Sequence, residues 1–274
     1  MTRIIEETRT CAVCGHESTQ HVRMSTSVFG SCDLDFRPPP LARSTMWSLY
    51  EKCPECGYVA STIEAELDDP AFLESDTYKK LASSPLRPLS TEMTRDFYRK
   101  HLIEKHNGEM EKAFVSLLAA AWCCDDARDK KTARALRKMC LEILVDLERN
   151  AESTEPSHAV LMADLMRRSH MFDDVVEMFD GMDLGDEMLT NLLAFEVDLS
   201  RTRNDKCHTV ADAEDWKPSQ KDAGVDRFQF AEEWNTLAQG ASPLATLRCC
   251  ARILVPMVKE RAGDFVDDHF KKHS

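Results

Sequence analysis

The sequence predicts a mainly α-helical protein with a small β region at its N-terminus. Helix-forming residue types (Leu, Ala, Met, Glu, Arg and Lys) are plentiful, glycine is limited to 9 of 274 residues, and runs of Val and Ile are few. With 43% hydrophobic and 30% charged residues, the chain can bury a core. An all-β sandwich or a doubly wound α/β fold is therefore not expected. The β region is expected where paired cysteines and alternating segments precede the helical patterns.

Four of the 11 cysteines form two near-identical units in the N-terminal region. They are Cys11 and Cys14, followed by Gly15, and Cys53 and Cys56, followed by Gly57. Two residues between thiolates allow a tight turn to aim both sulfurs at one ion, and the glycine permits the positive φ of that turn. These units look like the two halves of a zinc ribbon. Together they predict a tetrahedral site of four thiolates.

The two halves are separated by 38 residues, more than the roughly 15–20 of a minimal ribbon. An insertion over residues 24–44 is therefore expected to loop out. The segments 18–22 and 45–52 alternate well enough to be the short strands that carry the cysteines, with Trp47 and Tyr50 as packing residues.

Two neighbouring side chains compete as metal ligands. His16 follows Cys14 by two residues, and Cys32 lies in the insertion. A histidine beside such a turn is more often a surface or supporting group, so the four paired cysteines remain the expected ligands. Zinc is the default ion for a closed four-thiolate site, and iron is the alternative, because rubredoxins use a similar Cys-Pro-x-Cys-Gly turn for electron transfer.

The insertion contains the sequence Cys32-Asp-Leu-Asp-Phe36, followed by an arginine and three prolines. Asp33, Asp35 and Phe36 could belong to a shaped loop whose carboxylates bind a partner or a cation. The simpler expectation is a solvated turn with Phe36 tucked beneath it. The prolines are expected to stiffen the following segment.

Residues 68–90 are expected to form a connector, and helices are expected from residue 91 onward. Apolar residues recur at helical spacing in two long stripes, Phe114 to Trp122 and Leu136 to Leu147. Residues 159–179 pair two short helices with a turn near His170, which looks like a tetratricopeptide-type (TPR) hairpin. Small residues at corresponding positions are spaced 44 and 31 residues apart instead of about 34, so a plain helical bundle is equally compatible.

Further along the chain, Pro156 fits the first turn of a helix, and residues 200–226 are polar and predict a loop. Two more helices are expected over 227–238 and 243–260. The remaining cysteines in the helical part are expected to be core or edge residues. The expected domains are thus a four-cysteine ribbon over 1–67, the connector over 68–90 and a TPR-like helical domain over 91–274.

No glycine-rich phosphate loop, nucleophile elbow or zincin helix occurs in the sequence. The best acid–base candidates are His101 and His106, with Asp96 and Glu104 nearby on one helix. A spacing of five residues puts the two imidazoles about 140° apart, which is wrong for one shared metal. The sequence therefore predicts no catalytic residues.

The chain carries a net charge of −13, which disfavours binding nucleic acid or anionic lipid across the whole surface. Residues 1–60 are nearly neutral, with 6 basic and 7 acidic residues. A nucleic-acid contact would thus fall on the ribbon, through Arg23, Arg37 and Arg43. A charged N-terminus without a signal-peptide core, and an odd number of cysteines, predict a cytoplasmic protein with free or metal-bound thiols. No membrane anchor is expected, because the longest mostly apolar stretch, 114–124, has about half of the roughly 20 residues that a membrane-spanning helix needs.

The motifs Cys-Ala-Val-Cys-Gly-His-Glu (11–17), Cys-Asp-Leu-Asp-Phe (32–36) and Trp-Ser-Leu-Tyr-Glu-Lys-Cys-Pro-Glu-Cys-Gly-Tyr-Val-Ala (47–60) resemble a bacterial family of unknown function. Its members look like a split zinc ribbon with a DxDF insertion and TPR-like helices. The resemblance covers about residues 11–200. It implies metal ligation by the four paired cysteines and a role of unknown kind for Asp33, Asp35 and Phe36. The triple proline at 38–40 departs from the family pattern, which has a tyrosine-containing stretch there.

These observations predict a non-enzymatic, zinc-stabilised protein whose helical surface binds a protein partner, because stacked helical hairpins leave one concave face uncovered. The alternatives are a rubredoxin-like iron redox protein and a nucleic-acid-binding zinc ribbon.

Overall fold

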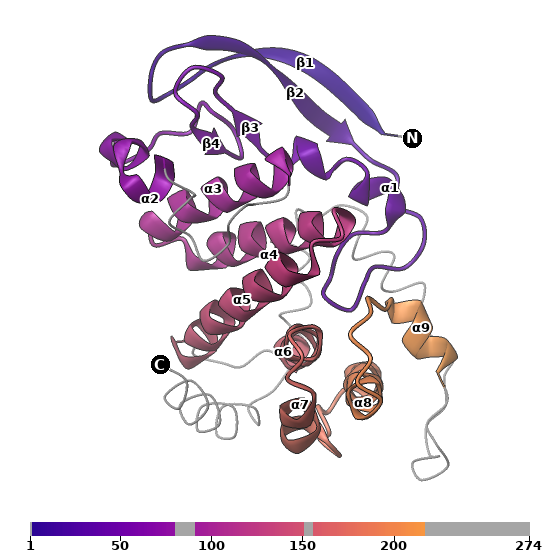
Figure 1. Ribbon diagram of the computed structural model, residues 1–274. Coiled ribbons are helices and arrows are strands. Elements are labelled where there is room, and N and C mark those ends of the chain that lie inside the picture. The colour runs from indigo at the N-terminus through magenta and orange to yellow at the C-terminus, as the bar shows by residue number, and fades with distance from the viewer. Residues whose placement is uncertain (1, 80–90, 151–155, 217–274) are drawn as a thin grey trace. The chain divides into compact units, whose positions relative to one another are not determined.

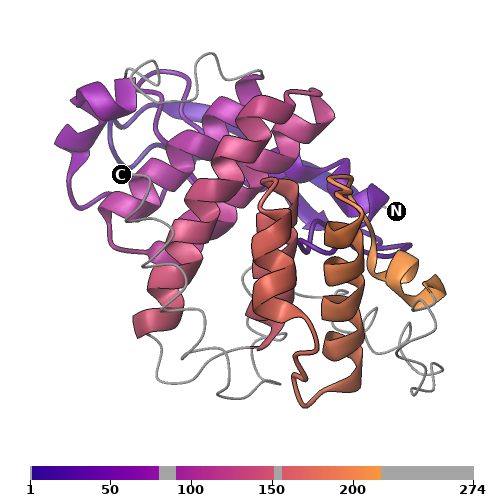
Figure 2. The same ribbon diagram turned by 60° about the horizontal axis from the view of Figure 1, so that its bottom comes forward.

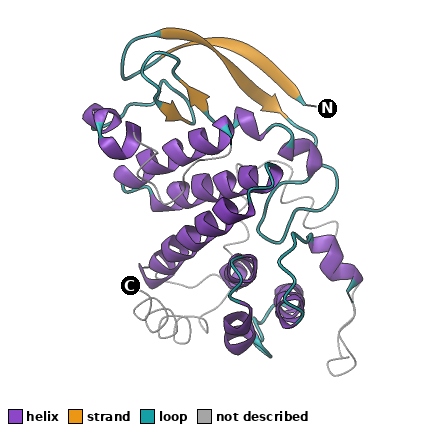
Figure 3. Ribbon diagram, viewed as in Figure 1, coloured by secondary structure: helices purple, strands orange, loops and turns teal. Residues whose placement is uncertain are grey.

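A computed structural model describes residues 2–79, 91–150 and 156–216 (Figure 1). Helices dominate the described part of the chain, and its strands form two small two-stranded sheets near the N-terminus (Figure 3). The predicted mainly α fold with a small N-terminal β region is therefore confirmed. In the described part, no helix combines the length and the apolar character needed to cross a membrane.

The chain divides into two compact units, and each is described separately. Of the described residues, unit 1 comprises 2–29, 40–79 and 91–136, and unit 2 comprises 30–39, 137–150 and 156–216. The long helix α5 (Lys130–Asn150) contains the division after Leu136. The domain boundaries expected from the sequence stay a prediction.

The sheets of unit 1 are two antiparallel hairpins. The first pairs β1 (Arg3–Thr10) with β2 (Glu17–Ser25), and the second pairs β3 (Glu51–Lys52) with β4 (Val59–Ala60). Each hairpin encloses one of the cysteine pairs in its turn. The strand expected over 18–22 is thus confirmed and is longer than expected.

The segment 45–52 was expected to be a strand, and only its last two residues are. The 3₁₀ helix η1 (Met46–Ser48) occupies the earlier part and follows the short helix α1 (Pro40–Arg43). In this turn Met46 takes the buried position, so Trp47 points outward and is 37% exposed. Its ring still packs edge-on against that of His21, with ring centroids 5.7 Å apart, and Tyr50 packs edge-on against Phe97 with ring centroids 5.0 Å apart.

The core of unit 1 joins the second hairpin to the helices that follow it. The helical elements here are η2 (Pro70–Glu74), α2 (Asp76–Lys79), α3 (Glu92–His106) and α4 (Met110–Asp126). Cys11, Cys53, Tyr58, Tyr78 and Ile103 belong to one buried cluster, so the cysteine turns pack directly on helix α3. The phenol of Tyr78 donates a 2.8 Å hydrogen bond to the carbonyl of Gly57, which fixes the second turn.

The helices α6 (Pro156–Arg168), α7 (Phe172–Phe179) and α8 (Glu187–Arg201) pack on one another in unit 2 (Figure 2). Pro156 begins α6 as expected, since a missing N–H costs nothing in the first turn. Between α6 and α7, His170 has a φ of 67°, which confirms the expected turn. The sequence indicates a TPR-type hairpin here, and the fold of these helices as TPR repeats stays a prediction.

One helix of unit 2 was missed by the sequence analysis. Helix α9 (Val210–Asp215) lies in the segment 200–226 that was expected to be a loop. Thr209 caps it by accepting a 3.1 Å hydrogen bond from the N–H of Asp212, whose carboxylate in turn accepts from the N–H of Thr209. This capping box stabilises a helix too short for its periodicity to be recognised. The helices expected over 227–238 and 243–260 lie outside the described residues.

Candidate metal centre

The two cysteine turns have the same backbone geometry. In the first, the N–H of Gly15 donates to the carbonyl of Cys11 (2.8 Å), and the N–H of Cys11 donates to the carbonyl of His16 (2.9 Å). Gly15 has a φ of 73°, the left-handed conformation that glycine adopts without strain. The turn continues directly from β1 into β2.

The second turn repeats this pattern between β3 and β4. The N–H of Gly57 donates to the carbonyl of Cys53 (3.1 Å), and the N–H of Cys53 donates to the carbonyl of Tyr58 (2.9 Å). Gly57 has a φ of 74°. The positive φ expected at both glycines is thus confirmed, and each turn presents two thiols on the same side.

The four thiols converge on one point in unit 1. All four Sγ atoms lie within 4.8 Å of one another. Cys11 Sγ is 3.7 Å from Cys56 Sγ, and Cys14 Sγ is 3.6 Å from Cys53 Sγ. Because a Zn–S bond of about 2.3 Å gives an edge of about 3.8 Å in a tetrahedron of sulfurs, these separations fit a four-thiolate metal site. The cluster can therefore hold one metal ion.

Burial and backbone N–H donors shift the pKa values of these thiols in opposite directions. Burial raises the pKa of Cys11 and of Cys56. Burial also acts to raise the pKa of Cys53, but hydrogen bonds from the N–H groups of Cys56 and Glu55 outweigh it, and the pKa lies below its ordinary value. N–H groups aimed at sulfur favour the thiolate form, which is the form that binds a metal.

Neither competing ligand joins the cluster. His16 is exposed and follows the first turn, and its imidazole does not belong to the metal-compatible group. Cys32 is buried in unit 2. Of the cysteines in the helices, Cys123, Cys124 and Cys140 are buried, as expected of core residues.

The loop with Asp33, Asp35 and Phe36 lies in unit 2 and is built into that unit. The N–H of Leu34 donates to the carbonyl of His208 (2.9 Å), and Asp33 forms an antiparallel bridge with Thr209. Phe36 has a φ of 61°, and its N–H donates to the carbonyl of Asp33 (2.9 Å), which closes a tight turn. Asp33 and Asp35 are both buried, so the expectation of a solvated turn is wrong.

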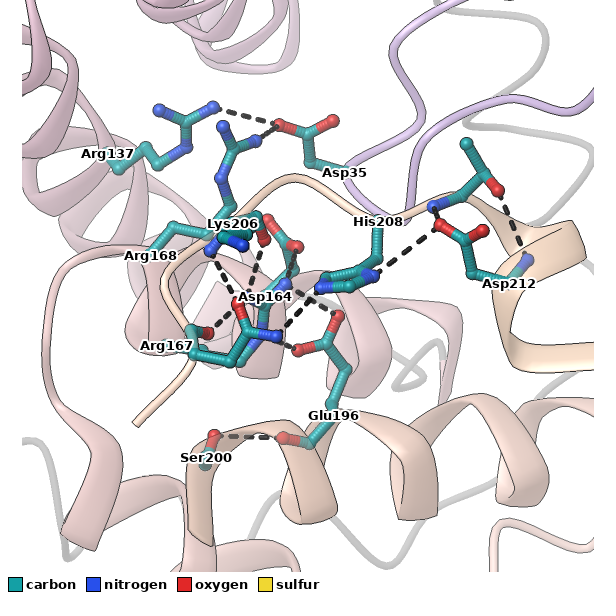
Figure 4. A network of polar contacts seen from close by, with 12 residues as sticks. Asp35, Arg137, Asp164, Arg167, Arg168, Glu196, Ser200, Lys206, His208 and Asp212 are labelled. Atoms are coloured by element: carbon teal, nitrogen blue, oxygen red, sulfur yellow. Dashed lines mark hydrogen bonds and ion pairs between the residues drawn. The ribbon is translucent and has the colours of Figure 1, made fainter. Parts of the chain in front are cut away.

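Asp35 owes its burial to two arginines. Its Oδ2 accepts hydrogen bonds from Arg137 Nη2 (3.1 Å) and Arg168 Nη1 (2.8 Å), and all three side chains are buried (Figure 4). Two cations satisfy one carboxylate here because a buried charge is stable only when paired. A role of this loop in binding a partner stays a prediction.

A second group of buried charges surrounds Arg167, the residue of α6 that directly precedes Arg168. Its guanidinium donates to Asp164 (2.8 Å), to Glu196 and to two backbone carbonyls, those of Asn204 and Lys206 (2.8 Å each) (Figure 4). Burial raises the pKa of Glu196 to about 8, and the charge of Asp164 adds to this effect while Arg167 opposes it. Burial likewise raises the pKa of Asp164.

The sequence analysis missed these charged residues. The sequence predicts a turn near His170, and neither Arg167 nor Asp164 is singled out there. The signal was present in the spacing, because Asp164 lies three residues before Arg167 and among the apolar residues Leu161 and Leu165. An acid and a base at i and i+3 on an apolar stripe indicate a buried pair.

The four acid–base candidates share helix α3, as expected, and each makes contacts within unit 1. Lys100 lies between Glu104 and Ser116, and Asp96 receives Lys52 Nζ at 3.1 Å. His106 stacks on Phe72 and bonds Asp69 (3.0 Å). Nδ1 of His101 lies 2.8 Å from the carbonyl of Ala113. The arrangement is one of helix packing.

His101 makes the protein sensitive to acid. Burial lowers its pKa to about 4, from about 6.5 in an unfolded chain. Its folded-state pKa is depressed, so the unfolded state takes up the proton first, and stability is lost as pH falls from about 6.5 towards 4. We expect about 2 kcal/mol of loss at pH 5 relative to pH 7.5 from this residue alone.

Urea titrations at pH 7.5 and pH 5 measure this effect. In His101→Asn, whose amide can still donate to the Ala113 carbonyl, the pH-dependent loss should shrink by about 2 kcal/mol. The exposed His21→Asn serves as the matched control. An identical loss in His101→Asn and the unsubstituted protein would contradict the prediction.

Comparison with known proteins gives no match to any protein-family model, curated protein or solved structure. The resemblance to a bacterial family of unknown function therefore rests on its motifs. Of the features that the resemblance implies, the structure has the four-cysteine cluster and a helical C-terminal region.

Proposed function

We propose that this protein is a non-enzymatic, zinc-binding interaction module whose helical unit binds a protein partner. The observation that carries the zinc assignment is the convergence of four thiols from two matching turns, with all Sγ atoms within 4.8 Å. Four protein ligands complete a tetrahedron and leave no position open for a substrate or for water. The ligands are Cys11, Cys14, Cys53 and Cys56.

A structural role for the zinc follows from what the cysteines join. Cys11 and Cys14 belong to the β1–β2 hairpin, whereas Cys53 and Cys56 belong to the β3–β4 hairpin. One ion would link two hairpins that are far apart in the sequence, the second of which has only two residues in each strand. An isolated two-stranded hairpin is marginally stable, so this link supplies stability that the strands lack.

The support for partner binding is a pocket in unit 2, formed by helices α8 and α9. Its apolar wall consists of Met188, Leu192, Val210, Ala213 and Trp216, with the polar groups of Asn191 and Glu214 beside it. An apolar groove between helices with a few polar groups at its edge suits an apolar side chain presented by a protein segment.

The non-enzymatic part of the proposal rests on how the acid–base candidates are used. Asp96 and Glu104 are held by lysines, and His101 bonds a main-chain carbonyl inside the core of unit 1. These contacts stabilise the packing of α3 and α4. Because these side chains already hold packing contacts, they favour a structural role over proton transfer to a substrate.

Iron is the second candidate for the site, and a rubredoxin-like redox role would accompany it. The favouring observation is the exposure of Cys14. A ligand sulfur near the surface gives an electron a short path to a docked partner. Nucleic-acid binding by the ribbon receives less support, since Arg37, one of the three arginines predicted for it, is buried in unit 2.

One preparation of the full-length chain tests both halves of the proposal. Elemental analysis should find one zinc per chain, and the zinc-loaded chain used as bait should capture a protein that Met188→Glu fails to retain. Glu187→Gln, at the exposed start of the same helix, is the matched control and should capture it equally. A coloured, reducible iron centre, or capture that Met188→Glu leaves unchanged, would contradict the corresponding half.

A further inference from the structure

The large hydrophobic side chains that are exposed in the described part of the chain gather in one stretch. They are Met24 (56% exposed), Phe29 (68%), Leu41 (42%) and Trp47 (37%). All four belong to unit 1 and lie between the two cysteine pairs in the sequence. Exposed apolar side chains concentrated in this way mark interaction sites in soluble proteins.

Contacts in unit 1 bring the segments that contain Leu41 and Trp47 to strand β2 near Arg23. Arg23 Nη1 donates to Thr45 Oγ1 (3.3 Å), and Thr45 Oγ1 donates to the carbonyl of Ala42 in α1 (3.0 Å). The ring of Trp47 meets that of the β2 residue His21 edge-on, at 5.7 Å. Helix α1, which carries Leu41, and η1, which carries Trp47, are thereby held against β2 on either side of Thr45.

Arg23 is half-buried, and among the described residues no carboxylate lies within ion-pair distance of it. Burial alone lowers the pKa of its guanidinium. A partly desolvated cation whose contact is a neutral hydroxyl gains more from an incoming carboxylate than a fully hydrated one does. Arg23 therefore favours an acidic ligand.

The surrounding sequence has the same charge preference. Residues 18–29 and 40–50 contain two arginines, one histidine and no acidic residue, in a chain whose net charge is −13. Glu6 of β1 approaches this area, with Oε1 at 3.5 Å from His21 Nε2. Glu6 lies opposite His21 in the β1–β2 pairing. Arg23 lies opposite the apolar Ile4, so its guanidinium can pair with a carboxylate of another molecule.

We propose that Arg23, Met24, Phe29, Leu41 and Trp47 form a docking surface for an acidic, apolar segment of a partner protein. We call these five residues the inter-knuckle surface. A carboxylate of the partner meets Arg23, and a large apolar side chain packs on Trp47. The proposal rests on the proposed function, since the cysteine cluster holds the two hairpins between which this stretch is inserted.

A protein segment fits this surface better than a nucleic acid does. A polyanion needs a row of basic groups along its backbone, and the net charge of the chain repels it. Leu41 and Met24 offer aliphatic surface, which packs against apolar side chains and does not stack on bases. Tryptophan, methionine and arginine are, in contrast, typical of the energetic centre of protein interfaces.

Selection from a displayed library of random peptides, with the full-length zinc-loaded chain as target, tests the proposal. The selected peptides should combine Asp or Glu with Leu, Phe or Trp. Their affinity should fall about tenfold or more in Arg23→Gln and in Trp47→Ala, as expected at the centre of an interface. Arg128→Gln makes the same charge change at an exposed arginine after α4 and should bind as the unsubstituted chain does.

Several results would overturn the assignment. Basic peptides, an empty selection, or acidic peptides that bind Arg23→Gln and Trp47→Ala undiminished would each do so. So would a random oligonucleotide pool whose binding depends on Arg23, or a dimer in sedimentation that Trp47→Ala dissociates, because a second copy would then be the occupant. The zinc content of every variant is measured as well. A variant that keeps its zinc but loses the peptide has lost the docking surface, whereas loss of zinc indicates a failure of the metal assignment or of folding.

Discussion

Replacing Cys53 by serine should abolish metal binding and unfold unit 1. Cys53 is fully buried, pairs with Cys14 across the cluster and belongs to the core that includes Tyr58 and Ile103. Structural zinc contributes about 10–16 kcal/mol to small zinc domains, more than the total stability of most domains. Elemental analysis should find no bound zinc, and amide hydrogen exchange in residues 2–29 and 40–79 should lose its protection.

The matched control is Cys140→Ser, the same substitution at a buried cysteine of α5 outside the cluster. It should lower stability through the buried hydroxyl and still retain zinc. The pair therefore separates loss of a ligand from loss of packing. A Cys53→Ser protein that keeps stoichiometric zinc, or that keeps slow exchange in both hairpins, would show that this cysteine is not a ligand.

The cysteine turns could be predicted from the sequence because their determinants are local. Spacing of the sulfurs and the following glycine fix each turn within a few residues, and Gly15 and Gly57 have the positive φ that this pattern requires. The convergence of the two turns followed from chemistry, since two thiols alone do not complete a tetrahedral site. Local turn geometry and the need for four ligands were therefore sufficient to predict the cysteine cluster.

The orientation of Trp47 could not be predicted in the same way. Its segment alternates like a strand, but hydrogen bonds from the N–H groups of Ser48 and Leu49 to Thr45 and Met46 wind it into a 3₁₀ turn. That turn rotates the indole outward. The choice between strand and 3₁₀ turn depends on the part of unit 1 against which the segment packs. The periodicity of the segment contains no information about that surface.

The buried ionic network depends on still more distant residues. Asp35 and Arg168 are 133 positions apart, and their pairing places the loop 30–39 in unit 2. The sequence singles out Asp35 by its motif, but it contains no signal that pairs this aspartate with Arg168. Helix α6, in addition, is buried on nearly all sides, so its charged residues had to find partners within the protein.

Asp35→Ala should destabilise unit 2 by about 3–5 kcal/mol. Removing the carboxylate breaks a buried ion pair with Arg137 and another with Arg168, and breaking a buried ion pair from one side costs this much. The turn would also be weakened, because Phe36 keeps its positive φ without the contact that anchors the neighbouring residue. Urea unfolding, monitored by hydrogen exchange in α6 and α8, measures the loss.

Asp173→Ala provides the comparison, since Asp173 pairs with Arg203 in a bidentate contact that is largely exposed. Exposed pairs contribute about 0–1 kcal/mol, so this variant should unfold nearly as the unsubstituted protein does. Zinc content should be unchanged in both variants because the cysteines belong to unit 1. Equal stability of the two variants would mean that Arg137 and Arg168 find other compensation when Asp35 is lost. The aspartate would then be free to serve a partner, as the motif resemblance leaves open.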